Sequence, residues 1–133
     1  MFYYLANPYQ GSKELMKERF EKCAKAVSKL IKNGIPTFSP IVHNHAMIET
    51  TGDWTLDERK KLLLPFDFSI LLKANGMILL KLEGYLESYG VEKELKFCLE
   101  NKIVVHEFTY DEIMNETQKL NALKSSKDLG IFL

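Results

Sequence analysis

The chain has 133 residues, of which 46% are hydrophobic and 27% charged, enough for a single domain with one hydrophobic core. Its 18 Lys and Arg residues balance its 18 Asp and Glu residues, so no net charge draws it to a nucleic-acid polymer or to an anionic membrane. No apolar stretch approaches the roughly 20 residues of a membrane span, and the first residues lack the features of a signal peptide.

The two cysteines, Cys23 and Cys98, each fall within a predicted helix, and neither has a second cysteine at CxxC spacing. Buried thiols are therefore favoured over a disulfide or a redox pair. Free thiols are typical of a reducing compartment, so we expect a cytoplasmic protein.

The first forty residues are predicted to form a strand, a helix and a second strand. Residues 2–6 are apolar and β-prone, and the turn-rich sequence NPYQG at residues 7–11 ends that strand. Residues 12–33 carry apolar side chains at helical spacing and end at Asn33-Gly34, a typical helix stop. A short second strand follows at residues 35–39. Strand, helix and strand with short connections indicate a parallel sheet.

The middle of the chain is less regular. Residues 41–53 show no sustained period, which predicts a long loop that is either functional or disordered. Thr55 and Glu58 have the spacing of a capping box and predict the start of a helix. Pro65 interrupts that helix and opens the next one, which places Asp67 in the first turn of a helix over residues 66–74.

Strands and helices alternate again toward the end. An apolar run at residues 77–82 predicts a buried parallel strand, followed by a polar loop at 83–89 and a helix from Gly90. Residues 102–107 are predicted as a strand, 110–124 as a final helix and 131–133 as a short apolar tail. We therefore expect residues 1–133 to form one three-layer, doubly wound α/β domain. Its parallel sheet of four to five strands would be flavodoxin- or Rossmann-like.

The loop after residues 77–82 is a candidate binding site, because ligands bind at the carboxyl ends of strands in an open α/β sheet. It brings Ser88 and the backbone N–H groups of Gly90 and Val91 to a helix N-terminus, which favours a phosphate or a carboxylate. Ser88 also has a simpler explanation, since a serine before a helix commonly caps it. Both interpretations of Ser88 stay open at this point.

The helix that follows carries two acids with different surroundings. Glu92 is expected to pair with Lys96 one turn on, as surface residues do. Glu94 has apolar neighbours instead, so desolvation would raise its pKa. The buried stripe of this helix is predicted at Val91, Leu95, Cys98 and Leu99.

Asp67 and Glu94 are the candidate catalytic residues. Each lies near a helix N-terminus, where an acid stabilises the helix dipole without any further role. If both face one cavity, the pair suits glycosyl transfer. One carboxylate would attack the anomeric carbon and the other would handle the sugar or a proton.

Other polar and aromatic residues are weaker candidates. His43 and His45 alternate with Asn44, and no Cys or acid stands beside them at ligand spacing, so a metal site is disfavoured. We expect the two histidines to line a pocket or to lie on the surface. Tyr9 and Trp54 could stack on a base or pack in the core. No metal and no cofactor is expected.

Several stretches resemble one known superfamily. They are YLANPY, a first helix with Arg19, FSPIVHNH, Trp54 with Asp67 thirteen residues later, and GYLESYGVEKEL. Together they cover roughly residues 3–105 and resemble the nucleoside 2-deoxyribosyltransferase-like superfamily, in particular a small branch seen in phage and bacterial genomes. The superfamily includes nucleoside deoxyribosyltransferases and 2′-deoxynucleoside 5′-monophosphate N-glycosidases. The most specific piece is S-x-G-V-x-x-E, which is similar to the motif of the monophosphate hydrolases.

The resemblance implies roles for individual residues. Glu94 would be the nucleophile that forms a glycosyl-enzyme intermediate, and Asp67 would hold the sugar and assist proton transfer. Ser88 stands where the nucleoside transferases have Asp and the monophosphate hydrolases have Ser, which favours a nucleotide over a nucleoside. The implied base and sugar pocket and the neighbouring motifs supply further candidate substrate-binding residues, namely Tyr4, Asn7, Tyr9, Ser39, His43, His45 and Trp54.

The chain also departs from the family pattern. Asn75 stands where the family usually has Asp, and Tyr85 where this branch usually has Trp. The hydrolases carry a Gly- and Arg-rich phosphate loop after their first strand. In this chain the corresponding NPYQGSK offers only Gly11, Ser12 and Lys13.

These observations lead to two functional hypotheses. The first is an N-glycosidase or deoxyribosyltransferase that acts on a nucleoside or a nucleoside 5′-monophosphate through a covalent intermediate on Glu94. The alternative is a non-catalytic nucleotide-binding or regulatory module of the same fold. In either case the partner is a small molecule and neither a nucleic-acid polymer nor a membrane. By resemblance, the protein is also expected to form a homo-oligomer.

Overall fold

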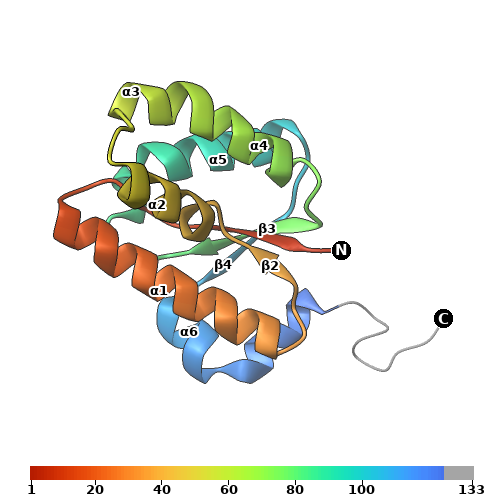
Figure 1. Cartoon of the computed structure of the whole chain (residues 1–133). Helices are drawn as coiled ribbons and strands as arrows, with labels where there is room; N and C mark the ends of the chain where they lie inside the picture. Colours follow the sequence, from red (N-terminus) through yellow and green to blue (C-terminus); the bar gives the residue numbers. More distant parts are fainter. Residues whose placement is uncertain (125–133) are drawn as a thin grey trace.

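A four-stranded, all-parallel sheet in the order β2-β1-β3-β4 forms the middle layer of the computed structural model, which describes residues 1–124 (Figure 1). The predicted apolar tail at residues 131–133 lies outside the described residues. The strands are β1 (Tyr3–Ala6), β2 (Thr37–Phe38), β3 (Gly76–Leu80) and β4 (Val105–Phe108). Helices cover both faces of this sheet, so the predicted α/β class with a flavodoxin- or Rossmann-like parallel sheet is confirmed.

The central strand β1 supplies side chains to both cores. Tyr3 and Leu5 face the layer of α1 (Lys13–Lys32) and α6 (Tyr110–Asn115). Tyr4 and Ala6 face the opposite layer, formed by α4 (Leu64–Leu71) and α5 (Tyr89–Glu100). Side chains alternate between the faces of a strand, so this register decides which of them lie beneath α5.

The predicted loop at residues 41–53 is wrong, because most of it forms α2 (Pro40–Thr51), which packs beside α1. The Ser39 side chain caps this helix, Pro40 stands in its first turn, and Gly52 closes it with a positive φ of 66°. Its buried face is Ile41, Asn44, His45 and Ile48. Two of these four residues are polar. The buried positions have helical spacing, but the hydrophobic residues alone do not show it.

The next helical stretch runs from residue 56 to 71 without a break. The predicted capping box of Thr55 and Glu58 is confirmed at the start of α3 (Leu56–Glu58). Between α3 and α4 lies one π-helical segment, η1 (Arg59–Leu63), in which the N–H of Leu64 donates to the carbonyl of Arg59. Pro65 lies in the first turn of α4, as predicted, but it does not interrupt the helical stretch, and α4 ends at Leu71 and not at residue 74. The wide turn before Pro65 accommodates a residue that has no N–H and that would clash with a carbonyl in an α-helix.

Several predicted boundaries are corrected. The strands predicted at 35–39 and 102–107 shorten to β2 and β4, and Lys102 before β4 has a positive φ of 57°. The loop at 83–89 contains the 3₁₀ turn η2 (Tyr85–Glu87). The final helix predicted over residues 110–124 divides at Glu116 into α6 and the 3₁₀ segment η3 (Thr117–Leu123), because Glu116 leaves helical geometry with φ −114° and ψ 64°.

Two expectations for α5 also change. Leu99 is 82% exposed and does not belong to the buried stripe, where Glu94 takes a place beside Val91 and Cys98. Lys96 pairs with Glu100 at 4.0 Å and not with Glu92. Both predicted free thiols, Cys23 and Cys98, are buried. In the described part of the chain no helix combines the length and the apolarity that crossing a membrane requires.

The cap of α2 provides a test of this fold. Ser39 Oγ accepts from the N–H of Val42 at 3.1 Å and lies 3.0 Å from Cys23 Sγ, with 4% of the residue exposed. We expect Ser39→Ala to lower the free energy of unfolding by about 1 to 2 kcal/mol, as loss of a buried cap does. Ser12→Ala, which removes the exposed cap of α1, should lower it by about 0.5 to 1 kcal/mol. Urea denaturation measures both, and equal losses would contradict the buried contact of Ser39.

Candidate functional site

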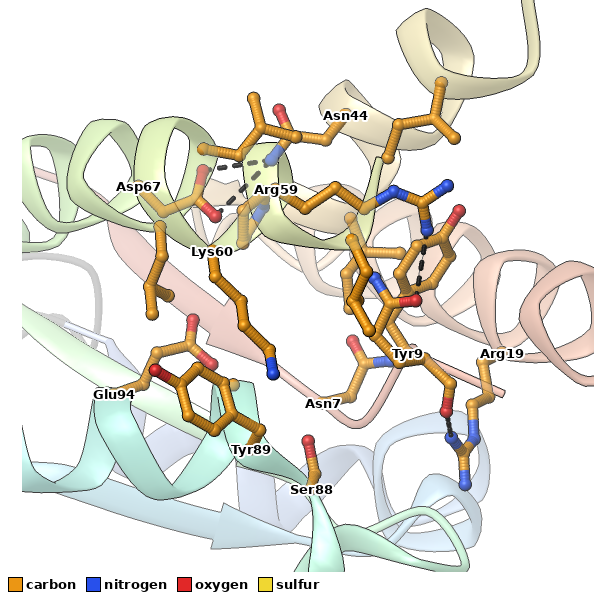
Figure 2. Close-up of a pocket in the computed structure, with 18 of the residues that line it drawn as sticks. Asn7, Tyr9, Arg19, Asn44, Arg59, Lys60, Asp67, Ser88, Tyr89 and Glu94 are labelled. Carbon is orange, nitrogen blue, oxygen red and sulfur yellow. Dashed lines mark hydrogen bonds between the residues drawn. The ribbon is translucent and has the colours of Figure 1, made fainter. Parts of the chain in front are cut away.

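A cavity of about 430 Å³ opens at the carboxyl ends of β1 and β3. Its walls come from the loops after β1 and β3, from α1, α2, α3 and η1, and from the N-terminal halves of α4 and α5 (Figure 2). Six of the predicted site residues line it, namely Asn7, Tyr9, Asp67, Ser88, Gly90 and Glu94. Residues from the loop after β1, from α4 and from α5 with its cap therefore meet at the sheet edge where the sequence predicted a site.

Glu94 is buried at one side of this cavity, with 5% of the residue exposed. The fully buried Tyr4 donates from its hydroxyl to Oε2 of Glu94 at 2.5 Å, which joins the central strand to α5. Burial raises the pKa of Glu94 to about 8; the Tyr4 hydrogen bond lowers it and the charge of Asp67 raises it. The predicted desolvation of Glu94 is therefore present, and the first cause of the shift is burial.

Asp67 faces the same cavity from α4. The amide of Asn44 donates to both of its carboxyl oxygens, at 3.0 Å to Oδ1 and 3.4 Å to Oδ2. Burial raises the pKa of Asp67 to about 6, while the Asn44 hydrogen bond and the charge of His43 lower it. The two carboxyl groups thus share one site with different proton affinities, a pattern found where acids and bases divide a reaction.

Three cations line the cavity as well. Arg19 donates to the backbone carbonyls of Gln10 at 2.9 Å and Glu83 at 2.8 Å. Arg59 donates to the side chain of Gln10 at 3.0 Å. The ammonium of Lys60 lies 4.4 Å from the ring centre of Tyr89 and reaches into the middle of the site (Figure 2). No ion pair within residues 1–124 involves any of the three, although the carboxyl groups of Asp67, Glu87 and Glu94 line the same cavity.

The N-terminus of α5 meets only part of the prediction. Ser88 lines the cavity and also caps α5, accepting from the N–H of Val91 at 3.3 Å. Ser88 can therefore cap the helix and face a ligand at the same time. Gly90 lines the cavity too, but Val91 is buried outside the lining and its N–H is already bonded to Ser88.

Tyr9 and His45 form a connected pair at the edge of the site. Tyr9 lines the cavity, and its hydroxyl lies 2.6 Å from Nδ1 of His45. The ring of His45 stacks on Phe20 with centroids 4.1 Å apart and does not line the cavity. His45 therefore fixes the position of Tyr9 from behind the cavity wall.

The structure places Ser39, His43 and Trp54 outside the cavity lining. Ser39 caps α2, and His43 is exposed with Nδ1 at 2.8 Å from the side-chain oxygen of Asn44. The backbone carbonyl of Trp54 accepts from Arg59 at 3.4 Å. Within residues 1–124 no three His, Cys, Asp or Glu side chains gather as a metal site would require.

Sequence reasoning did not identify Asn44, Arg59 and Lys60 as site residues. The buried spacing of Ile41, Asn44 and Ile48 was a usable signal, since it places Asn44 on the inner face of a helix. Arg59 and Lys60 gave no such signal, because the π-helical segment changes the direction in which they point.

The raised pKa of Glu94 predicts a dependence of stability on pH. The folded state holds the Glu94 proton up to about pH 8, whereas the unfolded chain loses it near 4.5, so wild-type stability falls as pH rises through this window. Glu94→Gln cannot ionise and should lose less stability between about pH 5 and pH 8. Urea denaturation at both pH values tests this. Glu92→Gln, on the exposed side of α5, is the control and should behave like wild type.

Comparison with known sequences assigns the chain to a protein family. No curated protein matches the chain. Residues 2–110 match the family described as Domain of unknown function (DUF1937). The match covers all four strands and every residue that lines the cavity. Because it spans most of the chain, the protein belongs to this family.

Proposed function

We propose that this protein cleaves or transfers the N-glycosidic bond of a nucleoside or a nucleoside 5′-monophosphate. One observation carries the proposal: two buried carboxyl groups with raised pKa values, Glu94 and Asp67, face one cavity at the carboxyl edge of the sheet. Each is held by its own hydrogen-bond donor, Tyr4 and Asn44 respectively. The resemblance to the nucleoside 2-deoxyribosyltransferase-like superfamily supports the same chemistry.

The reaction divides into two displacements at C1′ of the sugar. A carboxylate oxygen of Glu94 attacks C1′, the bond from C1′ to the base nitrogen breaks, and the base leaves with the electron pair and takes up a proton. Water or a second base then attacks C1′ and releases the Glu94 carboxylate. Asp67 holds the sugar and passes the proton between these steps, for which a pKa of about 6 is suited.

Two features of the site suit Glu94 to the role of nucleophile. The Tyr4 hydroxyl donates to its Oε2, and a donor stabilises the ionised form that attacks. The positive charge that develops on the sugar during bond cleavage also stabilises a buried carboxylate more than a solvated one. Burial of Glu94 raises the free energy of its carboxylate in the free enzyme. In the transition state the positive charge on the sugar compensates for this burial, so the barrier to attack falls.

The charge of the cavity favours an anionic substrate. Three cations, Arg19, Arg59 and Lys60, line the cavity with three carboxyl groups, Asp67, Glu87 and Glu94. Of these carboxyl groups, Glu94 with a pKa of about 8 is mostly neutral at pH 7, so the cations are in excess. Ser88 and Gly90 add a hydroxyl and a helix N-terminus. A 5′-phosphate matches these groups better than a free hydroxyl does.

One prediction of this mechanism concerns Glu94. Glu94→Gln and Glu94→Ala should abolish release of base, because neither side chain can form the covalent intermediate. In wild type, kcat/KM should rise with pH up to about 8, since only the ionised Glu94 attacks. Chromatography of the free base from a panel of nucleosides and 5′-monophosphates, with and without an acceptor base, measures both.

Glu92→Gln, which changes an exposed acid of the same helix, should retain activity and serves as the control. If Glu94→Gln releases base as fast as wild type, the mechanism is wrong. A rate that falls through the same pH range would instead make Glu94 the proton donor. Binding of a nucleotide with no base release on prolonged incubation would favour the non-catalytic nucleotide-binding module.

Another prediction of the proposed function concerns the cations of the cavity. Lys60→Met keeps the aliphatic stem and removes the charge, so kcat/KM for a 5′-monophosphate should fall roughly tenfold while the matching nucleoside is little affected. Lys61→Met is the matched control, because the neighbouring Lys61 is exposed, pairs with Asp57 at 3.1 Å and does not line the cavity. Equal losses for nucleoside and nucleotide would exclude a contact between Lys60 and the phosphate.

A further inference from the structure

Buried polar atoms without a partner gather at this cavity. Within residues 1–124, three buried side-chain nitrogen or oxygen atoms make no hydrogen bond: Oδ1 of Asn7 and the Nε atoms of Arg19 and Arg59. All three residues line the cavity. Proteins pair nearly all of their buried polar groups, so this clustering indicates that a ligand supplies partners. The arginines bond through their other nitrogens, whereas Oδ1 is the only side-chain acceptor of Asn7.

The orientation of Asn7 follows from its other contact. Its Nδ2 donates to the backbone carbonyl of Pro8 at 3.0 Å. A carbonyl oxygen only accepts, so the amide nitrogen must face Pro8 and Oδ1 must face away from it. Only 3% of Asn7 is exposed, and Figure 2 shows it between Ser88 and Tyr9 with its oxygen turned toward the interior of the cavity. The site therefore presents a fixed acceptor at the end of the central strand.

We propose that Asn7 is a specificity-determining residue whose Oδ1 accepts a hydrogen bond from an uncharged N–H or O–H group of the substrate. This inference rests on the proposed function and names the chemistry that its substrate must present. A nucleoside or nucleotide has three sources of such a donor: an exocyclic amino group of the base, a ring N–H of the base as in hypoxanthine or uracil, and a hydroxyl on the sugar. The substrate meets Oδ1 from the cavity side, because Asn7 is part of the cavity lining.

The physical consequence is selection against analogues that lack the donor. A carbonyl oxygen or a hydrogen atom in the same position leaves Oδ1 buried and unpaired, and a carbonyl oxygen also repels it. Sites built around a hydrogen bond reject such analogues more strongly than apolar pockets reject a missing methylene. We expect discrimination of roughly tenfold or more in kcat/KM between the members of a matched pair.

The experiment compares matched substrates in the full chain. One arm tests the base with two pairs of 5′-monophosphates, 2′-deoxyadenosine against 2′-deoxyinosine and 2′-deoxycytidine against 2′-deoxyuridine. In each pair the first member carries an exocyclic amino group and the second carries a ring N–H in its place, so the preferred member identifies the donor. The other arm tests the sugar with two pairs of 5′-monophosphates, adenosine against 2′-deoxyadenosine for the 2′-hydroxyl and 2′-deoxyadenosine against 2′,3′-dideoxyadenosine for the 3′-hydroxyl. Asn7→Leu keeps the volume and removes the acceptor. Because the ratio within a pair is measured on one preparation, it does not depend on the fraction of folded protein.

We expect wild type to prefer one member of a pair in one arm, namely the member that places its donor at Oδ1, and Asn7→Leu to lose at least about tenfold of that ratio. Asn33→Leu is the matched control, since it removes a similar bond from Nδ2 to the carbonyl of Lys29, at 2.8 Å, outside the cavity, and should leave the ratio unchanged. An Asn7→Leu variant with the wild-type ratio in both arms overturns the inference while base release persists. Absence of base release from every substrate overturns the proposed function, and the inference with it.

Discussion

The hydrogen bond from Tyr4 to Glu94 joins the central strand of the sheet to the helix that closes the cavity. Its two residues are 90 positions apart, so it exists only when β1 pairs with β3 and α5 packs on the correct face. The same bond keeps a carboxyl group in the apolar layer between α4, α5 and the sheet. A buried acid without a donor would be far more destabilising, so fold and site depend on one contact.

The sequence predicted the parts of the molecule whose environment is uniform. β1 and β3 are buried on both faces, so each reads as a continuous apolar run. The short loop from β3 to α5 then located Ser88 and Glu94 at the sheet edge. Cap chemistry located helix starts equally well, as at Thr55. Local physics determines these features, and a single sequence contains them.

The remaining features depend on long-range contacts that no local period records. α2 was missed because Asn44 and His45, which serve Asp67 and Tyr9, occupy buried positions that apolar side chains usually fill. Leu99 was assigned to the core because a helical wheel cannot show where the neighbouring layer ends. In both cases the local pattern and the tertiary structure disagree, and the disagreement at α2 arises where polar side chains face the site.

The π-helical segment between α3 and α4 sets the orientation of the cavity's cations independently of its carboxyl groups. One π turn holds one residue more than an α turn, and one residue corresponds to a rotation of about 100° around the helix axis. Asp67 is fixed by the packing of α4 on the sheet, whereas Arg59 and Lys60 take their direction from the segment before it. Insertion or deletion of a single residue there would reorient the cations while the two buried carboxyl groups stay in place. A related chain with a longer or shorter η1 segment could therefore favour a ligand of different charge, while Glu94 and Asp67 keep their positions.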